Sequence, residues 1–185
     1  HLSDDEVGMI AKSGAVVGLC PTTEANLGDG IFPLETFLDM GGNFGIGSDS
    51  HISVSAVEEL RLLEYGQRLD MQKRNIATSE KEVHTGTNLY KSALRGGSMA
   101  SGFKNNEIKT GNRADLIVLD RNASTLLATP DNHIIDRFIF NGNQNVVQHV
   151  FVAGEHLINN YEHANEDQIY DKFKTVMEGL QKHLD

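Results

Sequence analysis

Apolar and polar positions alternate along the first part of the chain in blocks that predict helices separated by short buried strands. Ser3-Asp4-Asp5-Glu6 has the form of a capping box, and it predicts a helix that runs to about Lys12 and ends at Gly14. The apolar run at 15–20 has no polar alternation and stops at Pro21, which is typical of a strand buried on both faces. Residues 22–30 are polar and contain glycine, so we expect a loop there.

The same alternation continues to about residue 99. A helix is expected over 33–40, a second buried strand over 44–47, and a third helix over 55–69. More helix is expected over 83–99, with an interruption at Gly96-Gly97. Helices and buried strands in this order predict the α/β class, with a parallel sheet and crossover helices.

The pattern changes after Gly102. Short apolar segments indicate strands, and two of the segments between them have the composition of hairpin turns. The expected strands are 114–120, 137–140 and 146–152, and the expected turns are Asn141-Gly142 and 153–155. The chain then returns in a further strand, up to about residue 158.

A final amphipathic helix is expected over 166–184. Its apolar residues fall on one helical face: Ile169, Phe173, Val176 and Leu180. We place a domain boundary between residues 102 and 112. The predicted domains are an α/β part at 1–102 and a mostly β part with a terminal helix at 103–185.

Composition narrows the possible partners. The net charge of −10 argues against nucleic acid and against an anionic membrane surface, since both bind basic proteins. A small-molecule substrate stays open, because its contacts are local. Cys20 is the only cysteine, which fits a reducing, cytoplasmic location, and no apolar run is long enough to span a bilayer. The sequence starts at His1 without a Met, so we expect a trimmed protein or a fragment.

Asp49 is the strongest candidate for chemistry. It follows the carboxyl end of a predicted buried strand, where the active sites of parallel α/β folds collect. The alternative is that Asp49 caps the next helix. The glycines of 45–47 and the polar side chains of Ser50 and His51 at the same strand end favour a site.

Several other residues have side chains that could take part in chemistry, and for each of them a structural role is the alternative. The segment that carries Glu24 and Asn26 leaves the preceding strand at the same end of the sheet, although an ordinary solvated loop is the alternative. Cys20 lies in an apolar strand with no basic neighbour and is expected to be a buried hydrophobe. The remaining histidines lack paired metal-ligand spacing, so surface or structural roles are expected for them: His84, His133, His149, His156, His163 and His183.

Several segments resemble a known family. Residues 19–34, with Thr-Thr-Glu-Ala-Asn at 22–26, resemble the segment after barrel strand seven of formimidoylglutamate deiminases, in the amidohydrolase superfamily. Residues 45–51, with Ser-Asp-Ser-His at 48–51, resemble the strand-eight motif of these enzymes, and 55–61 the helix after it. Residues 110–120 are similar to the strand that opens the β-sandwich of the wider superfamily.

The resemblance implies the C-terminal portion of a (β/α)₈ barrel, comprising strands seven and eight with flanking helices, followed by part of a β-sandwich and a terminal helix. It implies one divalent metal, usually zinc, and hydrolysis of N-formimidoyl-L-glutamate to N-formyl-L-glutamate and ammonia in histidine degradation. Asp49 is the implied metal ligand and catalytic base, and the other ligands precede residue 1 in family order. Glu24, Asn26 and His51 are the expected substrate-binding residues.

Two alternatives remain. One is another deaminase of the superfamily, of the guanine or aminohydrolase type, although those enzymes tend to have Ser-Asn where this sequence has Glu-Ala-Asn. The other is a non-catalytic fragment. We expect the 185-residue chain by itself to be inactive, to bind no stoichiometric zinc and to self-associate, because open strand edges invite pairing. The expected partners are further copies of the chain, or a missing N-terminal part.

Overall fold

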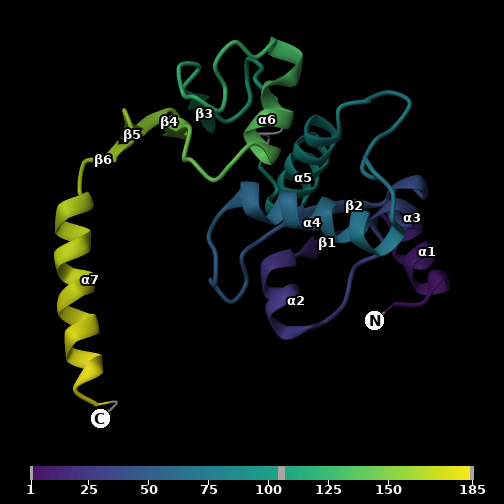
Figure 1. The fold of residues 1–185 in the computed structure, drawn as a ribbon, viewed down its shortest axis with the longest axis horizontal. Coiled ribbons are helices and arrows are strands. Elements are labelled where there is room, and N and C mark those ends of the chain that lie inside the picture. Colours follow the sequence, from purple (N-terminus) through teal and green to yellow (C-terminus); the bar gives the residue numbers. More distant parts are fainter. Residues whose placement is uncertain (1, 104–106, 184–185) are drawn as a thin grey trace. The chain divides into compact units, whose positions relative to one another are not determined.

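The computed structural model describes residues 2–103 and 107–183. The chain divides into two compact units, whose elements are labelled in Figure 1. The α/β unit comprises His1–Asn112 and Arg121–Gln144, and the ladder unit comprises Arg113–Asp120 and Asn145–Asp185. In the described residues no helix is both long enough and apolar enough to cross a membrane.

Helix α1 (Asp4–Ser13) begins as its sequence predicts. The backbone N–H of Glu6 donates to Ser3 Oγ at 3.4 Å, and the N–H of Ser3 donates to Glu6 Oε2 at 2.8 Å, which completes a capping box. These bonds from Ser3 hold the pKa of Glu6 below its usual value. Gly14 closes the helix with φ 74°, in the left-handed region that glycine adopts without strain. The predicted start and end of this helix are confirmed.

The two predicted buried strands form a parallel pair. Strand β1 (Val16–Leu19) lies beside β2 (Asn43–Ile46), in a register that runs from Val16 opposite Asn43 to Leu19 opposite Ile46. The α/β class is therefore confirmed. Helix α3 (Leu34–Asp39), near the predicted 33–40, buries Phe37 completely, in one core with Phe44.

The loop predicted for residues 22–30 is wrong over most of its length. Helix α2 (Pro21–Leu27) occupies it, with Pro21 in the first turn, where a missing N–H costs nothing. Glu24 Oε1 accepts the N–H of Cys20 at 2.8 Å, and Gly28 ends the helix with φ 74°. The polar composition indicated a loop, but local capping and a buried carboxylate described below stabilise a helix.

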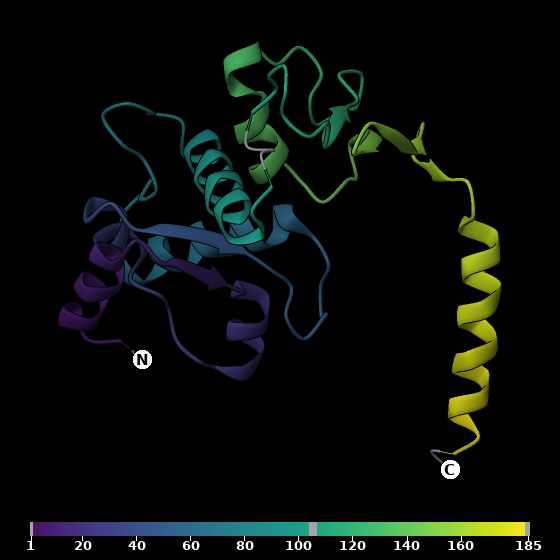
Figure 2. The ribbon, with the colours of Figure 1, turned by 180° about the vertical axis from the view of Figure 1, so that it is seen from behind.

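Helices α4 (Ala56–Met71) and α5 (Thr85–Ser101) match the predictions at 55–69 and 83–99. Helix α5 packs against β2, as Figures 1 and 2 show from opposite sides. The predicted interruption at Gly96-Gly97 is wrong, because α5 is continuous there. Gly96 serves close packing: a Cβ on it would collide with the backbone carbonyl of Phe44, whereas one on Gly97 would meet nothing within 4 Å.

The strand predicted at 137–140 is also wrong. A short 3₁₀ turn, η1 (Asp131–His133), leads into helix α6 (Ile134–Phe140), whose Ile139 is fully buried. The predicted hairpin turn at Asn141-Gly142 instead ends this helix, where the Asn141 N–H donates to Arg137 O at 2.9 Å. A short apolar run does not distinguish strand from helix by periodicity, and here packing against α4 and α5 decides.

The ladder unit is an antiparallel sheet in the order β3-β4-β5-β6, followed by a helix. The strand predictions at 114–120 and 146–152 are confirmed, and Ala153 and Gly154 make the predicted tight turn with φ values of 52° and 86°. The strands are β3 (Leu116–Leu119), β4 (Val147–Val152), β5 (Glu155–Asn159) and β6 (Glu162–His163). The predicted last helix is α7 (Glu166–Gln181), which has no buried residue.

Candidate functional site

The carboxyl ends of β1 and β2 lie at the same edge of the parallel pair. The Gly47 N–H donates to Leu19 O at 3.0 Å, so the pairing continues one residue past β2. Thr23, in the first turn of α2, then fixes the loop after β2 on both sides of Asp49. Its hydroxyl donates to Ser48 O at 3.0 Å and accepts the N–H of Ser50 at 3.3 Å. The sequence therefore places Asp49 in a loop held by the neighbouring strand's helix.

Asp49 has an unusual backbone and an exposed carboxylate. Its φ is 45°, and that of His51 is 56°, a region that residues other than glycine seldom occupy. The alternative assignment of Asp49 as a helix cap is wrong, because Ser55 caps α4 by accepting the Glu58 N–H at 3.3 Å. No other described residue forms a hydrogen bond with the Asp49 carboxylate, so its oxygens remain available to a ligand.

A buried carboxylate fixes the start of α2. Glu59 of α4 is only 2% exposed, and its Oε2 accepts the Thr22 N–H at 2.9 Å while its Oε1 accepts the Thr22 hydroxyl at 2.6 Å. A buried charge is stabilised when such bonds satisfy it. The sequence pattern does not single out this residue, although Glu59 lies four positions before buried Leu63, on the apolar side of its helix.

The other predicted site residues lie in the segments that directly follow β1 and β2. Glu24 is half-buried and holds the Cys20 N–H, while Asn26 is exposed on the last turn of α2 and His51 is exposed in the loop after β2. Burial, followed by the charges of Asp49, Glu24 and Glu59, raises the pKa of the Cys20 thiol. Asp49 and Glu24 thus both raise the pKa of the same thiol, which stays protonated at neutral pH. The substrate-binding roles of Glu24, Asn26 and His51 stay predictions.

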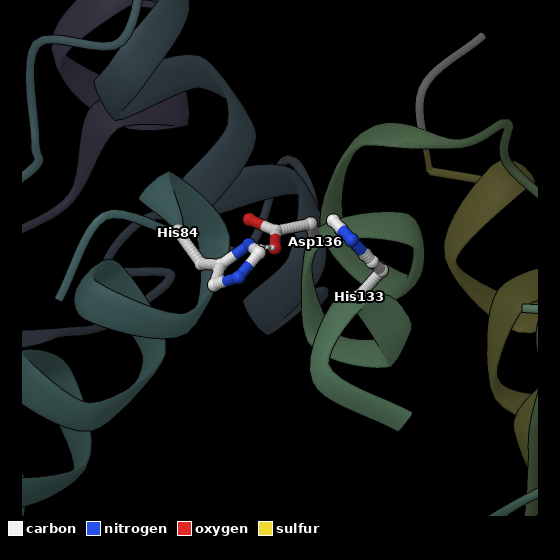
Figure 3. A group of neighbouring side chains, drawn as sticks. All are labelled: His84, His133 and Asp136. Atoms are coloured by element: carbon white, nitrogen blue, oxygen red, sulfur yellow. Dashed lines mark ion pairs between the residues drawn. The ribbon is translucent and has the colours of Figure 1, made fainter. Parts of the chain in front are cut away.

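A second group of ligand-type side chains comes from other elements of the α/β unit. His84 precedes α5, His133 ends η1, and Asp136 lies in the first turn of α6 (Figure 3). One ligand atom from each residue lies within 4.8 Å of the others. Spacing along the sequence gave no sign of this cluster, except that His133 and Asp136 stand three apart, on one face of a helical segment.

Residues 1–157 match the family described as the amidohydrolase family. The chain is 46% identical over 177 residues to the formimidoylglutamate deiminase of Pseudomonas aeruginosa, which covers 96% of this chain and 39% of that protein. The chain therefore belongs to the amidohydrolase family, and the resemblance drawn from its motifs is confirmed.

Solved structures agree on the fold. The crystal structure of an amidohydrolase from Brucella melitensis superimposes with a TM-score of 0.89 at 38% identity, covering 98% of this chain and 40% of that one. An adenosine deaminase from Xanthomonas campestris, solved with bound zinc, gives a TM-score of 0.73 at 22% identity, covering 95% of this chain and 41% of that one. The chain spans about two fifths of the length of these relatives.

Proposed function

We propose that this chain is the C-terminal part of a metal-dependent deaminase that hydrolyses N-formimidoyl-L-glutamate to N-formyl-L-glutamate and ammonia. The observation that carries the proposal is the 46% identity to a formimidoylglutamate deiminase across 96% of the chain. On this proposal β1 and β2 are strands seven and eight of a (β/α)₈ barrel, and the ladder unit belongs to its β-sandwich. The reaction then belongs to histidine degradation.

Asp49 fits a metal site by its chemistry. A carboxylate oxygen is a normal zinc ligand, and this one lies exposed at a strand end without a hydrogen bond from any described residue. One ligand does not hold zinc, because catalytic zinc sites usually have three protein ligands. The other ligands would come from the rest of the barrel. When bound, the metal would supply Lewis acidity and activate water.

The residues of this chain then have separate tasks. Asp49 would bind the metal, accept a proton from the attacking water and deliver it to the departing ammonia. Thr23 would position Asp49 by holding Ser48 and Ser50, and Glu59 would in turn hold the start of the same helix. Cys20 would stay protonated and take no part, because burial and three carboxylates raise its pKa.

The test is ammonia release by a protein in which this chain is joined to the rest of its barrel. N-formimidoyl-L-glutamate and guanine are offered separately, each with zinc and with a chelator. The proposal requires turnover of the first substrate and its loss with the chelator. Turnover of guanine alone would assign the protein to the ring-directed deaminases instead. Metal-independent turnover of either substrate would contradict the role given to Asp49.

A further inference from the structure

The cluster of His84, His133 and Asp136 has the composition of a metal site. Nδ1 of His84 lies 3.0 Å from Oδ2 of Asp136, and the two imidazole rings meet edge to face with centroids 4.7 Å apart. Figure 3 shows the three side chains converging from the start of α5 and from the η1–α6 segment. Two imidazole nitrogens and one carboxylate oxygen form a ligand set that zinc accepts.

The carboxylate is fixed from its other side. The Gly86 N–H donates to Asp136 Oδ1 at 2.6 Å, and a Cβ on Gly86 would lie 2.8 Å from the Asp136 Cα, so α5 and α6 approach closely here. The Oδ2 atom is buried, receives no hydrogen bond from the described residues and faces His84. A second bond that orients a ligating carboxylate is usual around metals, because it fixes the ligand in position.

An ion pair between protonated His84 and Asp136 would explain part of this arrangement. That pair involves only two of the three side chains, and it gives no role to His133, whose ring lies against that of His84. A metal ion would use a ligand atom from all three side chains at once. The nearby guanidinium of Arg68 lines the same pocket, but it is paired with Glu64 at 2.7 Å.

There is also room to complete a coordination shell. The cluster lies in an open pocket of about 270 Å³, where water can occupy the remaining position. Zinc bonds of about 2.0–2.2 Å require the most distant ligand atoms to draw together. His133 is exposed, so rotation of its side chain can close the gap.

We propose that His84, His133 and Asp136 bind a divalent transition metal of the zinc type, with water as a further ligand. The metal would join the start of α5 to α6 and stabilise the packing of these helices. The site uses none of the strand-end residues and does not depend on the proposed deaminase activity. This proposal and the expectation that the isolated chain binds no stoichiometric zinc predict opposite zinc contents.

The test is a zinc titration of the purified chain, with metal per chain measured by elemental mass spectrometry after gel filtration. About one zinc per chain is expected. His133→Ala and Asp136→Asn should remove it. His156→Ala is the matched control, because His149 Nδ1 and His156 Nε2 form another imidazole pair, 3.2 Å apart, in the ladder unit. Metal lost with His156→Ala but kept with His133→Ala would overturn the proposal, and so would no bound metal in the unmodified chain.

Two further measurements keep the test decisive. Zinc should raise the melting temperature of the unmodified chain and leave that of His133→Ala unchanged. If the isolated chain precipitates, the same variants are compared in a complete-barrel protein that carries Asp49→Asn, so that the strand-end metal is removed. Metal content that His133→Ala leaves unchanged in that protein would overturn the proposal. Failure of ammonia release has no bearing on these metal counts.

Discussion

The two units of the chain differ in how they are stabilised. Among the described residues, every buried apolar side chain except Val146 belongs to the α/β unit. The ladder unit is an antiparallel sheet with a register shift in each of two strand pairs, and it has almost no core. Phe173 and Val176 of its helix α7 are 61% and 59% exposed. Hydrogen-bonded strands without a buried face are marginally stable in water. Packing thus specifies the α/β unit, whereas the ladder unit needs apolar surface from outside itself.

The candidate site at Asp49 belongs to the better-packed of the two units. Asp49 and the residues that hold its loop lie in the α/β unit, where buried Glu59 and Phe44 fix the surrounding helices and strands. Within the described residues, however, β1 and β2 each have only one strand neighbour. Unpaired edges of this kind favour association with another chain. Self-association of the isolated chain stays a prediction, which light scattering can test.

The largest effect is expected from Asp49→Asn in a protein with a complete barrel. The change removes a ligand charge and the proton acceptor, so kcat should fall by more than the ~10–100-fold that loss of a ligand's supporting partner costs. Zinc content at the strand end should fall with it. Asp70→Asn, an exposed carboxylate on α4, is the control and should leave both unchanged. Normal turnover with Asp49→Asn would place the chemistry elsewhere.

Replacing a phenylalanine by alanine should reduce the free energy of unfolding much more in the α/β unit than in the ladder unit. Phe44→Ala empties a fully buried position in the α/β unit, and a cost of about 3–5 kcal/mol in unfolding free energy is expected. Phe173→Ala, on exposed α7, should change it by less than about 0.5 kcal/mol. Urea unfolding of both variants measures the contrast. A similar loss for Phe173→Ala would mean that α7 has a covered face in solution.

Two adjacent glycines give a sharper test of packing inside the α/β unit. Gly96→Ala places a methyl group against the Phe44 carbonyl, so a loss of about 1–3 kcal/mol is expected. Gly97→Ala has open space and should stabilise helix α5 by up to about 1 kcal/mol, because alanine is the better helix former. Thermal unfolding of the pair should show shifts of opposite sign. Shifts of the same sign would mean that α5 does not pack closely on β2.

Much of the α/β unit could be predicted because its signals are local. The capping box at Ser3, the apolar runs of β1 and β2, and Gly14 each need only neighbouring residues. Helix α2 could not be predicted, because its first turn depends on a contact between Thr22 and Glu59, 37 positions apart. Helix α6 was predicted as a strand because only tertiary packing distinguishes the two for a short apolar run.

The two candidate sites also differ in how far the sequence alone could locate them. Asp49 could be placed after a strand from sequence order, and the structure puts it there, although its catalytic role remains a proposal. The cluster of His84, His133 and Asp136 could not be found from spacing, because α5 and α6 bring together residues 49 and 52 positions apart. The division into domains at 1–102 and 103–185 stays a prediction.

The smallest expected effect concerns the thiol of Cys20, which reports on the charges around it. Burial comes first, and the charges of Asp49, Glu24 and Glu59 add to it, so the folded pKa lies above the ordinary thiol value. Less thiolate is then present at neutral pH, and alkylation by iodoacetamide should be slower than in urea-unfolded chain. The protonated thiol contributes to the stability of the folded state at every pH below the pKa of the unfolded chain. This contribution is lost as the pH rises through the pKa of the folded state.

Asp49→Asn removes the charge that acts most strongly after burial, so the pKa of Cys20 should fall toward its ordinary value and alkylation should speed up a few-fold. The rate is measured in metal-free chain across the alkaline range, where the whole rate profile should shift to lower pH. Asp70→Asn serves again as the control with no expected shift. An unchanged profile with Asp49→Asn would mean that the carboxylate does not face the β1 strand end, and would remove the geometric basis for a shared site.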